Sequence, residues 1–384
     1  MAAANLPKLF QPTKVGPVML SHRVVFAPLT RLRSTKSTHV PIVSLMKEYY
    51  GQRARVSGTL LITEATFIAP QAGGHDNVPG IWSDDQIDAW KEITDTVHAH
   101  GSSIFLQLWA LGRVADPSIL ASYNPPFPLV GPSSIPVSSQ TLTPPRPLTT
   151  DEITEYTELF AQAAHNAVHR AGFDGVEIHG ANGYIVDQFL QDVSNDRTDQ
   201  YGGSVEGRSK FALEVVDAVS RAVGPERTGL RLSPWSTFQD MGMVDPVPQF
   251  THLVTALRDA HPSLAYLHVV EPRASGPFER EYGAHESNDF VRAIWQERPY
   301  ISAGGHTPAT AVAAAERDSE LVAFGRFYIS NPDLPLKLKN NRALTPYDRK
   351  TFYTPGERED AHIGYTDYPF ERDFEDIPVV RVAA

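Results

Sequence analysis

The stretch TTDEITEYTELFAQAAHNAVHRAGFDGVEIHG (149–180) predicts one helix followed by one strand. Thr149 with Glu152 three residues later is the capping-box pattern that starts a helix. Apolar residues then recur every three or four positions, which places them on one helix face. These residues are Ile153, Tyr156, Phe160, Ala163, Ala167 and Ala171. The short apolar run DGVEIHG (174–180), bounded by turn residues, is typical of a buried strand.

Seven further short apolar runs repeat this strand pattern, and segments of helical periodicity separate most of them. The runs are 24–30, 60–67, 103–110, 228–234, 265–272, 300–305 and 321–326. Helix starts are expected at Ser83 with Gln86, at Thr307 with Pro308 and at Asn331 with Pro332. Alternation of strand and helix favours a parallel sheet, and eight units favour a closed (β/α)8 TIM barrel over an open doubly wound sheet.

Two stretches lie outside this alternation. Residues 12–23, PTKVGPVMLSHR, predict an N-terminal β-hairpin in front of the first strand, where it would plug the barrel floor. Residues 113–148 are rich in Pro and Ser with little periodicity, so we interpret them as a long excursion after strand three, on the catalytic face. We expect the whole chain, 1–384, to form a single barrel domain, because α/β barrels routinely reach this length.

Bulk composition narrows the function classes. With 41% hydrophobic and 21% charged residues the chain is typical of a globular protein. The net charge of −11 disfavours nucleic acid and acidic membrane surfaces as partners, and no apolar run is long enough to span a membrane. The first residues carry no export or import pattern, so we expect a cytoplasmic protein. Without cysteine there is no thiolate iron–sulfur or zinc site, so redox chemistry would come from an organic cofactor.

The ends of the last two strands carry a pattern typical of phosphate sites. Gly304 and Gly305 follow strand seven, and Gly325 with Arg326 follows strand eight. Barrel enzymes commonly bind phosphate there through bare backbone N–H groups and a fixed cation. The alternative is a tight glycine turn and an Arg326 that pairs with a surface carboxylate. These residues alone do not separate the two interpretations.

Other classes of barrel enzyme fit less well. A glycosidase needs two carboxylates, and Glu64, Glu177 and Glu271 lie near strand ends, but Glu177 is better interpreted as a polar packing contact among the strands. A Schiff-base aldolase needs a buried strand-end lysine, and no predicted strand contains one. The pair His98 and His100 ends a helix ahead of strand three, on the wrong face for a catalytic metal. No metal site is predicted.

The strand-end residues together resemble the old yellow enzyme family of FMN-dependent ene reductases, and its fungal members in particular. The resemblance runs in order from about residue 8 to about residue 370. The matching blocks are APLTR (27–31), TEATFIAPQAGG (63–74), LQLWALGR (106–113), HGANGYIVDQFLQDVSNDRTDQYGGS (179–204), GLRLSP (229–234), VEP (270–272), SNDF (287–290) and FGRFYISNP (324–332).

The resemblance implies that FMN lies across the top of the barrel. The matching cofactor positions are Pro28, Leu29, Thr30, Ala65, Gln107, Arg231, Gly304, Gly305, Gly325 and Arg326. Arg231 and Gln107 would face the N1–C2 edge, where reduced flavin is negative, and this contact would raise the reduction potential. Thr30 would place its hydroxyl near the O4 side of the ring, close to N5.

The resemblance also implies the catalytic groups. His179 and Asn182 would hold the carbonyl or nitro oxygen of the substrate, and Tyr184 would donate a proton to the α-carbon. Aromatic pocket positions are matched by Trp109, Phe278 and Tyr365.

This set predicts a ping-pong ene reductase that uses NADPH or NADH to reduce an enone or a nitroalkene. Tyr184 favours net reduction over isomerisation. The alternatives are a flavin-dependent isomerase or reductase of a secondary-metabolite intermediate, and an FMN-binding protein without catalysis. A monomer and a homodimer remain equally open.

Overall fold

The computed structural model describes residues 6–138 and 143–371, and eight parallel strands close into a barrel. Each strand pairs with the next, the eighth pairs with the first, and the predicted barrel is confirmed. The strands are β3 (Val24–Phe26), β4 (Leu60–Ile62), β6 (Ser103–Trp109), β9 (Gly175–Gly180), β10 (Thr228–Leu232), β11 (Tyr266–Val270), β14 (Tyr300–Ala303) and β15 (Leu321–Phe324).

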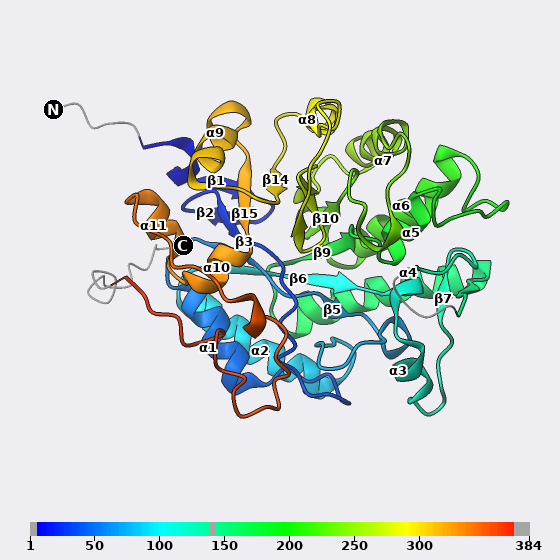
Figure 1. The fold of residues 1–384 in the computed structure, drawn as a ribbon, viewed down its shortest axis with the longest axis horizontal. Helices are drawn as coiled ribbons and strands as arrows, with labels where there is room; N and C mark the ends of the chain where they lie inside the picture. Colours follow the sequence, from blue (N-terminus) through cyan, green and yellow to red (C-terminus); the bar gives the residue numbers. More distant parts are fainter. Residues whose placement is uncertain (1–5, 139–142, 372–384) are drawn as a thin grey trace.

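Helices surround the strands on the outside of the barrel (Figure 1). The main ones are α1 (Val43–Ala54), α2 (Asp84–Ala99), α4 (Thr150–His165), α6 (Val205–Val223), α7 (Val247–Ala260), α8 (Asp289–Trp295), α9 (Pro308–Asp318), α10 (Arg326–Ser330) and α11 (Leu334–Lys339). Ser83 and Thr149 each start a helix with a capping box, as predicted, and Thr307 is the N-cap residue ahead of Pro308, also as predicted. The apolar stripe of α4 is buried against the strands, which confirms the opening helix.

Two local predictions were wrong. The helix expected from Asn331 begins at Leu334 with Asp333 as its N-cap residue. The Asn331 side chain is occupied instead by bonds to Thr345 and to the Lys337 ammonium, so it cannot cap a helix. The second predicted strand, 60–67, splits into β4 and a separate β5 (Thr66–Phe67), which pairs with β6.

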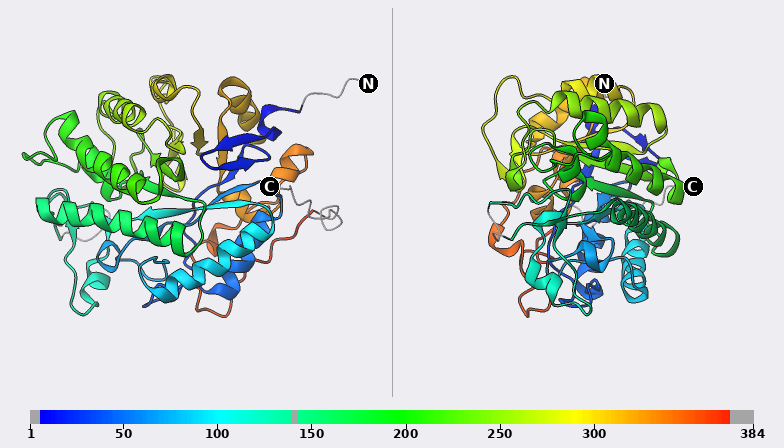
Figure 2. Two further views of the ribbon diagram at one scale, coloured as in Figure 1. Left: turned by 180° about the vertical axis from the view of Figure 1, so that it is seen from behind. Right: turned by 90° about the vertical axis from the view of Figure 1, so that its right-hand side faces the viewer.

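The two irregular stretches have the expected places. Strands β1 (Thr13–Val15) and β2 (Val18–Leu20) form an antiparallel hairpin, and Val15 and Leu20 pack in one cluster with residues at the barrel floor such as Leu60 and Phe105 (Figure 2). In its described residues, 113–138 and 143–148, the excursion after β6 contains a 3-10 turn, the short helix α3 (Pro117–Ala121) and the two-residue strands β7 (Val130–Gly131) and β8 (Arg146–Pro147). No helix in the described ranges has the length and apolarity to cross a membrane.

Candidate active site

Strand register brings four polar side chains into one buried layer of the barrel. Glu177 on β9 pairs with Gln107 on β6, and Arg231 on β10 pairs with His268 on β11. The Glu177 carboxylate accepts a hydrogen bond from Gln107 Nε2 at 2.7 Å and another from His268 Nδ1 at 2.8 Å. Glu177 therefore binds two neighbouring side chains within the barrel. This agrees with the prediction that it makes polar contacts among the strands.

Burial and the contacts within this layer determine the protonation states of Glu177 and His268. Burial acts against ionisation of Glu177, but the hydrogen bonds from His268 and Gln107 and the positive charge of Arg231 outweigh it and hold its pKa below the ordinary value. Burial and the nearby Arg231 keep the pKa of His268 low, so the neutral ring donates from Nδ1 to the carboxylate. Arg231 Nε is buried without a hydrogen-bond partner in the described ranges. A buried N–H group without a partner is costly, so Arg231 is suited to an anionic or carbonyl ligand.

His179 ends β9, and its protonation state follows from one contact. The backbone N–H of Ala181 donates to His179 Nδ1 at 3.3 Å, so Nδ1 carries no proton. Burial lowers the pKa of His179 well below its ordinary value, and the positive Arg231 lowers it further. The ring is therefore neutral with its proton on Nε2, which is a hydrogen-bond donor.

Asn182 and Tyr184 follow His179 on the turn into helix α5 (Ile185–Leu190). Asn182 has a left-handed backbone with φ 59°, and its amide oxygen is buried without a partner among the described atoms. The Tyr184 ring meets the His179 ring edge-on at 4.8 Å and the Trp109 ring edge-on at 4.7 Å. The predicted carbonyl clamp, proton donor and aromatic wall are thus brought together.

A cavity of about 270 Å³ opens beside Arg231 at the carboxyl ends of β3, β14 and β15. Gly304 and Gly305 have φ of 109° and 62°, and a Cβ on Gly304 would lie 2.8 Å from the Ala274 Cβ. Glycine is thus required for backbone that lies this close to the cavity. The predicted residues that line it are Pro28, Leu29, Arg231, Phe278, Gly304, Gly305, Gly325 and Arg326.

The contacts of Arg326 do not separate its two interpretations. The guanidinium lines the cavity and also forms an ion pair with Glu279 at 2.6 Å. Glu279 lies on β13 (Phe278–Glu279), which pairs with β12 (Ala274–Ser275) over the cavity wall. An anion in the cavity would therefore compete with Glu279 for Arg326.

The remaining cofactor positions are not among the residues that line this cavity. Thr30 is half-buried directly after Leu29, and Gln107 belongs to the polar layer around Glu177. Ala65 packs in one apolar cluster with Trp109, and Tyr184 lies against the same cluster.

The structure does not bring Tyr365 to the cavity, contrary to the expectation for this residue. Tyr365 has no exposed surface, stacks on Tyr49 at 3.9 Å and covers the guanidinium of Arg33. Tyr353 lies at the predicted place instead: it lines the cavity, is half exposed, and acts on the pKa of Tyr184. The reason is the path of the irregular C-terminal segment, which turns Tyr365 towards the helix α1.

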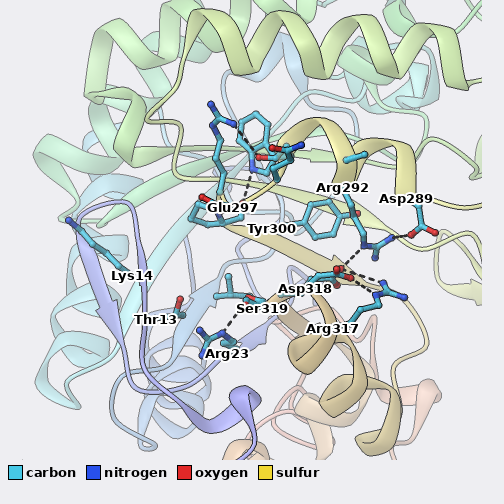
Figure 3. A pocket seen from close by; sticks show the side chains of 17 residues that line it. Thr13, Lys14, Arg23, Asp289, Arg292, Glu297, Tyr300, Arg317, Asp318 and Ser319 are labelled. Atoms are coloured by element: carbon cyan, nitrogen blue, oxygen red, sulfur yellow. Dashed lines mark hydrogen bonds and ion pairs between the residues drawn. The ribbon is translucent and has the colours of Figure 1, made fainter.

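A larger depression of about 930 Å³ lies at the opposite end of the barrel, where β14 and β15 begin (Figure 3). Its charged side chains largely satisfy one another: Arg292 pairs with Glu320, and Arg317 pairs with Asp318. Barrel enzymes react at the carboxyl ends of their strands. The cavity beside Arg231 is therefore the candidate active site.

Comparisons with known proteins agree with this geometry. The sequence model of the NADH:flavin oxidoreductase / NADH oxidase family matches residues 8–345. The NADP-dependent oxidoreductase lnbE of Aspergillus flavus is 50% identical, covering 98% of this chain and 100% of the relative. The chanoclavine-I aldehyde reductase fgaOx3 of Penicillium roqueforti is also 50% identical, covering 96% and 98%. The crystal structure of Old Yellow Enzyme from Pichia sp. superposes with a TM-score of 0.86 at 38% identity, covering 95% and 94%. The chain belongs to the old yellow enzyme family.

Old yellow enzymes are FMN-dependent oxidoreductases that take reducing equivalents from NADPH or NADH, and this chain is one of them. Its residues fit the cofactor on structural grounds. The guanidinium of Arg231, whose buried Nε has no hydrogen-bond partner among the described residues, suits the flavin edge that becomes negative on reduction. The open backbone at Gly304 and Gly305 and the cation of Arg326 suit the phosphate.

Sequence reasoning missed three contributors to this old yellow enzyme site. His268 could have been found, because a histidine that alternates with apolar residues on a predicted buried strand needs a partner inside. Tyr353 lies in a segment without periodicity, where nothing in the sequence tells which aromatic residue faces the cavity. Gln239 has a left-handed backbone, but glutamine is not a residue type that indicates this conformation, as glycine and asparagine are.

Proposed function

We propose that this protein is an ene reductase that transfers a hydride to the C=C bond of an α,β-unsaturated carbonyl or nitro compound. The observation that carries the proposal is the neutral His179 ring, which has its free Nε2–H donor beside Asn182 and Tyr184. Two donors at one oxygen next to a proton source are what activation of an enone requires. FMN, when bound, supplies the hydride after reduction by NADPH or NADH.

His179 and Asn182 act on the substrate oxygen. As hydride reaches the β-carbon, negative charge grows on this oxygen, and donors already in place stabilise the charge without reorganisation. Because Ala181 occupies Nδ1, the ring of His179 is held in the tautomer that donates. Loss of one such donor typically slows a reaction by roughly 10² to 10³-fold.

Tyr184 supplies the proton to the α-carbon. Burial raises the pKa of its hydroxyl above the ordinary value, and Tyr353 adds to this rise, so the group is protonated at neutral pH. A proton donor at this place completes the reduction instead of leaving the enolate to isomerise. The similarity to a relative named chanoclavine-I aldehyde reductase supports an unsaturated aldehyde as one member of the substrate class.

The test is spectroscopic. We expect the purified protein to be yellow, to be bleached anaerobically by NADPH and to recover its colour on addition of 2-cyclohexenone. Phenol should produce a long-wavelength charge-transfer band with the oxidised enzyme. In a variant with His179→Ala and Asn182→Ala, FMN should remain bound while the phenol band and enone turnover are lost. Bleaching by NADPH without recovery by any enone or nitroalkene would contradict the proposal.

A further inference from the structure

Two left-handed backbone pairs face each other beside the proposed proton donor. Asn182 and Gly183 have φ of 59° and 77°, and Gln239 and Asp240 have φ of 60° and 57°. A Cβ built on Gly183 would lie 3.0 Å from the Gln239 Cβ, so the two turns are in direct contact. Residues other than glycine rarely adopt this conformation, and where they do, the surroundings hold them.

The second turn is held from outside the active site. Arg113 donates from Nη2 to the carbonyl oxygen of Gln239 at 3.0 Å. Ser138 donates from its backbone nitrogen and its hydroxyl to the Asp240 carboxylate, at 2.5 and 2.8 Å. Both Arg113 and Ser138 belong to the excursion after β6, so this excursion fixes the strained turn.

The strained turn directs one side chain towards the catalytic groups. Gln239 Nε2 donates to the carbonyl oxygen of Asn182 at 2.6 Å. The same side chain acts on the Tyr184 hydroxyl, because it lowers the pKa that burial of the phenol raises. An amide nitrogen has two hydrogens, so it can serve both oxygens at once.

We propose that Gln239 is a positioning residue of the proton-transfer step, in which its amide holds Tyr184 against Asn182 and donates to the Tyr184 oxygen as the proton leaves. The proposal rests on the proposed function. In this step the Tyr184 O–H bond breaks and the proton goes to the α-carbon, where the enolate electron pair forms the new C–H bond. The O–H electron pair stays on Tyr184 as a phenolate, and solvent later returns the proton.

The donor from Gln239 matters most for that phenolate. A hydrogen bond to a charged oxygen is worth more than one to a neutral hydroxyl, so the contact stabilises the state after proton transfer more than the state before it. Gln239 thus assists a donor whose own pKa is raised by burial, without touching the substrate.

The test is a double-mutant cycle on the rate at which 2-cyclohexenone reoxidises the NADPH-reduced holoenzyme. We expect Gln239→Leu to slow reoxidation about 10-fold or more, as for loss of a hydrogen bond to a charged group. In a Tyr184→Phe background the same substitution should have no further effect, because the phenolate is gone. Thr237→Val, on the same loop but with a hydroxyl that contacts Ser275 instead of the strained pair, is the matched control and should leave the rate unchanged.

The outcomes separate the two proposals. If Tyr184→Phe slows reoxidation and Gln239→Leu does not, or if Gln239→Leu slows it equally in both backgrounds, the role of Gln239 is overturned while the ene reductase stands. If wild-type enzyme reduces no enone, the proposed function fails. Should Gln239→Leu not bind FMN, Gln239→Asn makes the comparison, since asparagine tolerates the left-handed backbone and keeps a shorter amide.

Discussion

The carboxylate of Glu177 and the amide nitrogen of Gln107 are joined by a buried hydrogen bond of 2.7 Å inside the barrel. Because an ionised carboxylate only accepts hydrogen bonds, the contact settles which end of the Gln107 amide is nitrogen. The amide oxygen of Gln107 is then directed away from Glu177. Glu177 also interacts electrostatically with Arg231, so one carboxylate influences both groups proposed to face the flavin edge.

Glu177→Gln should raise the reduction potential of bound FMN. The substitution keeps an acceptor for Gln107 but removes a negative charge near Arg231, and the unopposed guanidinium then stabilises the anionic reduced flavin more strongly. We expect a rise of roughly 30 mV, equivalent to about 1.4 kcal/mol for two electrons. An anaerobic titration against a reference dye measures it, and thermal unfolding checks that the barrel is intact. An unchanged or lower potential would contradict this role.

The rate of enone reduction should change near pH 7 because of Asp187, not His179. Burial raises the pKa of Asp187 to about 7, while its bonds from Gly183 N–H and Gln191 act against this rise. Above this pH the ionised carboxylate accepts both bonds and holds the turn that carries Asn182. Below it the protonated group must give up one of them, so reoxidation by 2-cyclohexenone should slow.

Asp187→Asn removes the titrating group, so its rate profile between pH 5.5 and 8.5 should be flat. Burial and the nearby Arg231 lower the pKa of His179 well below its ordinary value, so His179 does not account for an inflection near pH 7. An inflection near pH 7 that survives in Asp187→Asn would count against this assignment.

Acid should destabilise the barrel partly through His22. Val24 N–H donates to His22 Nδ1 at 3.2 Å, Nε2 lies 3.0 Å from the Thr59 hydroxyl, and burial lowers the pKa to about 4. A histidine with a lowered folded pKa adds stability above its unfolded pKa of 6.5, and this stability is lost as pH falls from 6.5 towards 4. The loss amounts to about 3 kcal/mol at most. Urea unfolding at pH 7 and pH 5 should show a smaller difference for His22→Gln than for wild type.

Patterns among neighbouring residues predicted most of the helices and strands. They failed where a contact with a residue distant in the sequence determines the local structure. The N-cap residues Ser83, Thr149 and Thr307 and the eight apolar runs depend on neighbours within a few residues, and they were predicted correctly except that the run 60–67 splits into two strands. Asn331 looked like a helix cap, but Thr345, 14 residues away, binds its side chain. The left-handed backbone of Gln239 depends on Arg113, which lies 126 residues earlier.

The candidate site shows the same division. His179, Asn182 and Tyr184 are close in sequence, so their grouping follows from one strand-to-helix turn. Which of Tyr353 and Tyr365 lines the cavity depends on the path of the irregular C-terminal segment. This path places the Tyr365 ring over Arg33 and against Tyr49.

Substitutions of Arg326 and of its ion-pair partner Glu279 should change FMN binding in opposite directions. Their 2.6 Å ion pair occupies the cation that we propose for the cofactor phosphate. Glu279→Gln frees this cation, and because Glu279 is largely exposed the gain should be modest, up to about fivefold tighter binding. Arg326→Gln removes a charged hydrogen bond to phosphate, so FMN should bind about 10 to 100-fold more weakly.

Fluorescence titration of apoprotein with FMN measures both dissociation constants. The gain from Glu279→Gln should shrink in 1 M salt, where the exposed ion pair is screened in wild type as well. Riboflavin, which lacks the phosphate, is the matched control ligand and should bind wild type and both variants alike. Weaker FMN binding by Glu279→Gln would mean that Glu279 supports the phosphate site instead of competing with it.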